Sequence, residues 1–98
     1  MAWELYNISS GHCSVDNFGL EAEEIPTVLQ KLQDHFQDRL VLGRQAGIGL
    51  SAVGIDILVD GVPLTVGWDN WSGVFIMARD AAGDTILKEL EVYLNYIE

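Results

Sequence analysis

The sequence predicts an α+β fold, in which a single antiparallel sheet of 4–5 strands, in the order β-α-β-β-β-β-α, has two amphipathic helices packed on one face. Apolar residues recur at helical spacing around residues 24–36 and again after residue 84. Between these segments, alternating runs flank the pair Asp60-Gly61, which favours a tight hairpin turn. Strands joined by short turns pair antiparallel, and one sheet face can cover both helical stripes.

The N-terminal part is predicted to contain one strand and one loop. Residues 2–8 are short and rich in aromatic and β-forming types, which favours a strand. Residues 11–20 are predicted to be a loop because they include the turn formers Asp16, Asn17 and Gly19. Within this loop, Val15 and Phe18 are expected to anchor the chain to the core.

Each predicted helix has an apolar stripe and a start signal. The first helix, at about residues 24–36, has Pro26 in its first turn, where a missing N–H costs little. Its stripe consists of Ile25, Val28, Leu29, Leu32 and Phe36. For the second helix, Asp80 or Asp84 can act as the N-cap. Its stripe consists of Ile86, Leu87, Leu90, Leu94 and Ile97.

The middle of the chain is predicted to form most of the sheet. The predicted strands are residues 40–42, 55–59, 62–68 and 74–78. A glycine-rich stretch, 43–49, follows the first of them, and residues 48–50 are expected to add further sheet pairing. Asp60-Gly61 is expected to adopt positive φ at both turn positions.

Length and charge exclude several classes of function. The 98 residues suffice for one domain, 1–98, and the formal net charge is −10. The five Lys and Arg residues are scattered, whereas binding to nucleic acid or an anionic membrane surface requires clusters of them. No apolar stretch reaches the roughly 18 residues that a membrane span needs. We therefore expect neither nucleic-acid nor membrane binding.

The sequence predicts no catalytic, cofactor or metal site. A single cysteine, Cys13, and two histidines are too few for a typical zinc site. The glycine pattern at residues 47–52 precedes a predicted strand, whereas a dinucleotide fingerprint precedes a helix. We therefore expect no enzyme. One cysteine cannot form an internal disulfide, and the N-terminus lacks a signal-peptide pattern, so a cytoplasmic location is expected.

The aromatic residues give the most informative functional signal. Trp71 stands in a predicted polar turn beside Asp69 and Asn70. Its ring either folds back over the sheet edge or is exposed as an anchor for a partner, a role for which tryptophan is enriched. With Asp56 on the polar side of the hairpin, these residues are the candidate partner-binding set. They favour a non-enzymatic acidic protein-binding module, in concrete form an inhibitor or immunity-type protein that binds a basic partner.

Two other hypotheses remain open at this stage. One is a small-ligand-binding domain with a pocket between the helices and the sheet. The other is a homodimer formed through an exposed strand edge or through apolar residues on the open sheet face, such as Leu58 and Phe75. The element order resembles that of many small bacterial α+β proteins, a likeness of fold that carries no functional residue.

Overall fold

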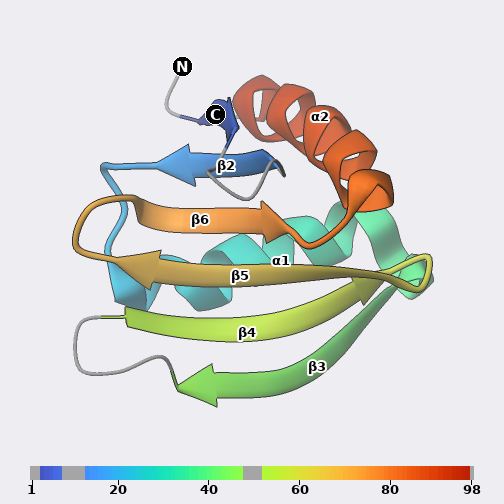
Figure 1. Cartoon of the computed structure of the whole chain (residues 1–98), viewed down its shortest axis with the longest axis horizontal. Helices are drawn as coiled ribbons and strands as arrows, with labels where there is room; N and C mark the ends of the chain where they lie inside the picture. Colours follow the sequence, from blue (N-terminus) through green and yellow to red (C-terminus); the bar gives the residue numbers. More distant parts are fainter. Residues whose placement is uncertain (1–2, 8–12, 48–51, 98) are drawn as a thin grey trace.

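A computed structural model describes residues 3–7, 13–47 and 52–97 of the chain. It contains one antiparallel sheet of six strands, in the spatial order β1-β2-β6-β5-β4-β3, and two α-helices (Figure 1). The strands are β1 (Glu4–Asn7), β2 (Cys13–Asn17), β3 (Leu40–Gly47), β4 (Ala52–Val59), β5 (Val62–Asp69) and β6 (Gly73–Ala78). The helices are α1 (Ile25–Phe36) and α2 (Ala81–Tyr96), with short 3-10 turns at Ala22–Glu24 and Gln37–Arg39.

The α+β class and the antiparallel sheet are confirmed, but the predicted strand number is wrong. Residues 13–17, predicted to be loop, form β2, which pairs with both β1 and β6. The physical reason is alternation: Cys13 and Val15 are buried in the core, while Ser14 and Asp16 point to the opposite face. The turn-forming residue types in this segment obscured that pattern.

The central hairpin is confirmed. Asp60 and Gly61 have φ values of 54° and 78°, which match the right-handed twist of the strands that they join. β3 extends beyond the predicted 40–42 to Gly47, with an irregularity between Leu42 and Gln45. The predicted pairing of residues 48–50 lies outside the described residues.

Each helix begins at a signal that the sequence carries, but only α2 has a side-chain N-cap. Pro26 lies in the first turn of α1, as predicted. Asp80 is the N-cap of α2, because its carboxylate accepts a hydrogen bond from the Gly83 N–H at 3.0 Å. The carboxylate of Asp84 instead accepts a hydrogen bond from the Cys13 N–H at 2.8 Å, and so links α2 to β2.

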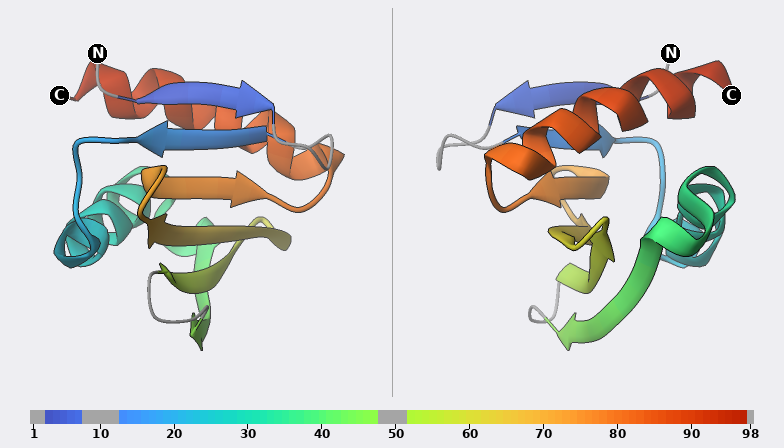
Figure 2. Two further views of the ribbon diagram at one scale, coloured as in Figure 1. Left: turned by 60° about the vertical axis from the view of Figure 1, so that its left-hand side comes forward. Right: turned by 90° about the vertical axis from the view of Figure 1, so that its right-hand side faces the viewer.

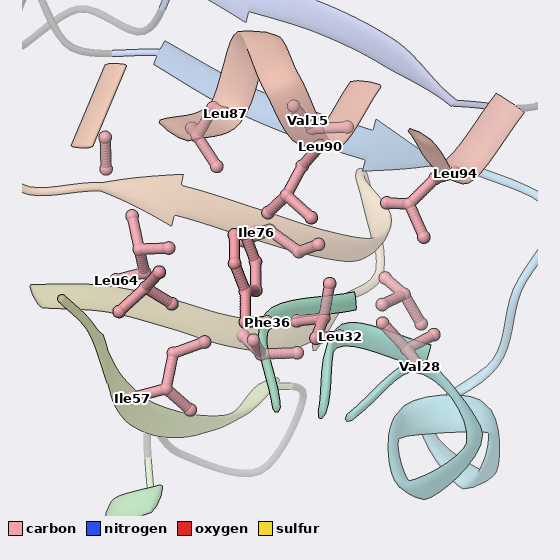
Figure 3. Packing of buried hydrophobic residues seen from close by; sticks show 14 of the residues in the cluster. Val15, Val28, Leu32, Phe36, Ile57, Leu64, Ile76, Leu87, Leu90 and Leu94 are labelled. Carbon is pink, nitrogen blue, oxygen red and sulfur yellow. The ribbon is translucent and has the colours of Figure 1, made fainter. Parts of the chain in front are cut away.

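The core lies between one face of the sheet and the two helices. In Figure 3, side chains from α1, α2 and four strands point into the same space: Val28, Leu32, Phe36, Leu87, Leu90, Leu94, Val15, Ile57, Leu64 and Ile76. All ten are almost completely buried. Each helix therefore contributes its apolar stripe to one continuous cluster, and burial of these stripes supplies most of the stability.

Helix α2 also covers the outer edge of β1. The Asn95 side chain accepts a hydrogen bond from the Trp3 N–H (3.1 Å) and donates one to the Trp3 carbonyl (3.0 Å). The Glu91 carboxylate accepts a hydrogen bond from the Leu5 N–H at 3.0 Å. These side chains occupy the backbone groups that a further strand would use, and they therefore protect this edge from pairing with another chain.

Truncation of a core residue of α2 tests this packing. We expect Leu90→Ala to lower the free energy of unfolding by about 2–5 kcal/mol, because it removes a fully buried side chain and leaves a cavity. Val92→Ala is the matched control, since Val92 is 70% exposed on the same helix, and it should change stability by less than about 0.5 kcal/mol. Urea denaturation followed by circular dichroism measures both, and equal effects would contradict the assigned core.

Candidate functional site

The loop between β5 and β6 presents a tryptophan to solvent. The Oδ1 atom of Asp69 accepts hydrogen bonds from the backbone N–H groups of Trp71 (2.9 Å) and Ser72 (2.6 Å). These bonds hold the loop in one conformation. Trp71 is nevertheless 82% exposed. Of the two interpretations of this residue, the exposed one therefore holds, and the ring is not folded back over the sheet.

Gly73, at the end of the same loop, lies tightly against the segment that follows β2. Its φ is 69°, and a Cβ atom there would lie 2.2 Å from the Asn17 carbonyl oxygen and 2.8 Å from the Phe18 Cα. Glycine is therefore required at this position both for the backbone angle and for the close approach. The contact brings the Trp71 loop and Phe18 to the same end of the sheet, where β2 and β5 end and β6 begins (Figure 1).

Two further aromatic residues are exposed near this end. Phe18 is 57% exposed, so the expectation that it anchors the chain to the core is wrong, whereas Val15 is fully buried as expected. The Phe18 ring packs edge-to-face against Tyr6 of β1, with a centroid distance of 5.9 Å. Tyr6 is itself 37% exposed. A sheet end with three exposed aromatic side chains is typical of a contact surface.

Carboxylates border these rings. Glu4 accepts a hydrogen bond from the Tyr6 hydroxyl, which raises the pKa of Tyr6. Asp16 is buried on the open face and accepts a hydrogen bond from Ser14 Oγ at 2.5 Å. Desolvation raises the pKa of Asp16, and the nearby charge of Asp69 raises it further. We define the aromatic–acidic surface as Tyr6, Phe18 and Trp71 together with Glu4, Asp69 and Asn70.

The structure does not bring Asp56, the fourth predicted site residue, to this surface. Asp56 pairs across the sheet with Thr65, whose hydroxyl donates a hydrogen bond to it at 3.0 Å. Arg79 Nη2 lies 3.4 Å from the same carboxylate, so this charge is already partnered. Asp69 pairs instead with Ala52, toward the other end of β4. Asn70, by contrast, is exposed beside Trp71.

Tyr6, Phe18 and the buried Asp16 were not among the predicted site residues. The alternation of Cys13 and Val15 with Ser14 and Asp16 was the signal that could have found them, because it marks a strand. A second strand paired with residues 4–7 ends at Asn17 and places Phe18 directly after the sheet.

The described residues show no arrangement suited to nucleophilic or metal chemistry. Burial raises the pKa of the Cys13 thiol, whereas a reactive cysteine needs a lowered one. No three His, Cys, Asp or Glu residues within the described ranges are placed to share a metal ion. His12 and residues 48–51 of the glycine motif lie outside the described residues.

The second histidine has a packing role. The Nε2 atom of His35 lies 2.6 Å from a carboxylate oxygen of Glu89, and its ring stacks on Tyr93 with a centroid distance of 4.1 Å. Both partners belong to α2, so His35 joins the two helices at their exposed margin.

Comparisons with known proteins add no assignment. No family model, curated protein or solved structure matches the chain. In the part of the chain that the structure describes, neither helix is long and apolar enough to cross a membrane. Function is therefore inferred from the chemistry of the surface itself.

Substitution of Gly73 tests the contact that positions the Trp71 loop. We expect Gly73→Ala to lower stability by about 1–3 kcal/mol more than Gly61→Ala does. Both residues have positive φ, but a Cβ at Gly61 meets no atom within 4 Å, so the difference isolates the clash with residues 17 and 18. Chemical denaturation of the two variants measures it, and equal losses would show that the close approach carries no cost.

The buried Asp16 predicts a pH-dependent stability difference. Because its pKa is raised on folding, the native state binds the proton more tightly than the unfolded chain, and wild-type stability falls as the pH rises through the folded pKa. Asp16→Asn keeps an oxygen that can accept the Ser14 hydrogen bond but removes the charge. We expect this variant to be more stable than wild type at pH 7, with the difference lost below the unfolded-state pKa of about 3.9. Urea denaturation at pH 7 and pH 3 measures it; a variant that is less stable at pH 7 would contradict it.

Proposed function

We propose that this chain is a non-enzymatic protein-binding module that uses the aromatic–acidic surface to bind a basic partner protein. The exposed Trp71 on a fixed loop is the observation that carries the proposal. A large ring held in place gives up little conformational freedom on binding and buries a large apolar area. Tryptophan and tyrosine are also the side chains most often found at the energetic centre of interfaces.

The distribution of charge supports a basic partner. The chain has 15 acidic and 5 basic side chains. Two of the basic residues form ion pairs within the chain. The Nη2 atom of Arg39 lies 2.6 Å from Asp60 Oδ2, and that of Arg79 lies 3.4 Å from Asp56 Oδ1. The aromatic–acidic surface itself contains two carboxylates and no cation. Such a surface attracts positively charged proteins over long range and raises their association rate.

In its specific form, the proposal is an inhibitor or immunity-type protein that covers the basic active site of a toxin such as a nuclease. The ring of Trp71 would enter that site, while Glu4 and Asp69 would face the cations that bind phosphate there. We propose the reducing cytoplasm as its location, because Cys13 is a buried free thiol.

The alternative, a small-ligand-binding domain, has weaker support. Core side chains occupy the space between the helices and the sheet, where such a pocket was expected. The groove of about 600 Å³ that the described residues form lies on the outer side of α2 and β1, and it is broadly open to solvent. Ligand pockets usually bury most of their ligand, which an open groove cannot do.

Replacement of the exposed tryptophan tests the proposed function. Wild type, Trp71→Ala and Tyr96→Ala are used as baits in lysate of the source cells, and the captured proteins are quantified by mass spectrometry. Tyr96 is the matched control, because it is an 85% exposed aromatic residue on α2, outside the surface. We expect basic proteins to be captured by wild type and Tyr96→Ala but not by Trp71→Ala. With the purified partner, Trp71→Ala should weaken binding by about 30-fold or more.

A change of charge distinguishes electrostatic binding of a basic partner from non-specific adsorption. Asn70→Lys adds a positive charge beside Trp71 at an exposed position, so it should slow association with a basic partner at low salt and leave stability unchanged. If all baits recover the same proteins, or if the captured proteins are acidic, the proposal is wrong.

A further inference from the structure

β3 is an unprotected edge of the sheet, on the opposite side from β1 (Figure 2). The Asp60 N–H donates a hydrogen bond to the Arg39 carbonyl at 2.9 Å. Because inward and outward backbone groups alternate along an antiparallel strand, Val41 then bonds toward β4, while the Leu40 carbonyl and both backbone groups of Leu42 point outward. The Leu40 N–H already donates a hydrogen bond to the Gln37 carbonyl. Among the described residues, none bonds these outward groups.

The side chains next to this edge are apolar and accessible. Val41 and Leu42 are each 56% exposed. Leu58, which pairs with Val41 on the open face, is 39% exposed. An unpaired edge flanked by apolar residues is a template for pairing with another strand.

The charge pattern indicates which strand it pairs with. Residues 39–55 contain no Asp or Glu, although the whole chain has a formal net charge of −10. A second copy carries the same negative charge, so it meets the least repulsion where this chain has no carboxylate.

We infer that two copies of this chain form a symmetric dimer by antiparallel pairing of their β3 strands. In the register centred on Val41, the Leu42 N–H of each copy donates a hydrogen bond to the Leu40 carbonyl of the other. Val41 then faces Val41 of the second copy across the two-fold axis, at the closely spaced, non-hydrogen-bonded position.

The dimer contact is separate from the aromatic–acidic surface. Leu58 lies near the end of β4 that leads into Asp60, whereas the Trp71 loop follows Asp69, which pairs with Ala52 at the other end. The dimer therefore leaves the aromatic–acidic surface of both copies accessible. The dimer proposal can thus be tested independently of the proposed function.

Sedimentation equilibrium and cysteine crosslinking test the dimer. We expect wild type to change from the 10.8 kDa monomer to twice that mass as its concentration increases. Leu42→Pro removes an outward N–H that has no partner within the monomer, so it should weaken the dimer at least 10-fold without unfolding the chain. Circular dichroism checks the fold of this variant.

Crosslinking tests the register without relying on proline. Under mild oxidation, Val41→Cys should form a disulfide between two copies, because its Cβ atoms would face each other across the axis. Leu58→Cys is the matched control: it is exposed beside Val41 but lies one strand further from the axis, beyond the reach of a disulfide. A wild type that remains monomeric, a Leu42→Pro variant that dimerises like wild type, or equal crosslinking of both cysteines would overturn the proposal.

Discussion

The structure depends on burial of two apolar helical stripes against one face of the sheet. Because α1 and α2 share that face, alternate residues of every strand point to a face without a covering layer. Polar side chains there satisfy one another instead. Ser14 donates a hydrogen bond to Asp16, and Thr65 donates one to Asp56, although Ser14, Asp16 and Thr65 are all buried. The buried polar side chains of the open face are therefore hydrogen-bonded within the sheet.

The position of α2 makes the two edges of the sheet unequal. As it crosses β2 and β6 to bury Leu87, Leu90 and Leu94, its outer margin reaches β1, where Glu91 and Asn95 bind the free backbone groups. α1 lies toward the other side of the sheet, and among the described residues of the β3 edge the chain itself satisfies the Leu40 N–H, through the Gln37 carbonyl. One edge is therefore capped by the chain itself, and the other depends on what approaches it.

Periodicity predicted the elements whose environment is uniform along their length. The stripes of both helices were evident because their apolar positions face one core, with the exception of Ile97, which follows α2 and is 40% exposed. The Asp60-Gly61 hairpin was evident from its turn residues and the alternating runs beside them. β2 was missed because its outward residues, Ser14 and Asp16, are of types that also favour turns, and only pairing with β1 and β6 makes them strand residues. The alternation of residues 13–16 was a usable signal, but the turn-forming types competed with it, and the β6 strand that settles the pairing lies far away in sequence.

The candidate site shows the same limit. Trp71 could be singled out from its polar neighbours, but its exposure depends on how the loop closes, through Asp69 and through the contact of Gly73 with residues 17 and 18. Phe18 belongs to the surface because it directly follows β2. Asp56 lies away from the surface, where its carboxylate contacts Thr65 and Arg79. Residue type thus indicated which side chains could bind a partner, while sheet register decided which of them lie together.

Charge relates the two proposed contacts to each other. A net charge of −10 favours basic partners, but it also opposes self-association wherever carboxylates would meet. Residues 39–55 avoid this conflict because they contain no acidic side chain, and they include the one sheet edge that α2 does not cap. The carboxylates Glu4, Asp16 and Asp69 are instead found near Trp71, Phe18 and Tyr6, away from β3. Segregation of charge along the chain would therefore let one acidic surface attract a partner while a second copy binds through the neutral edge.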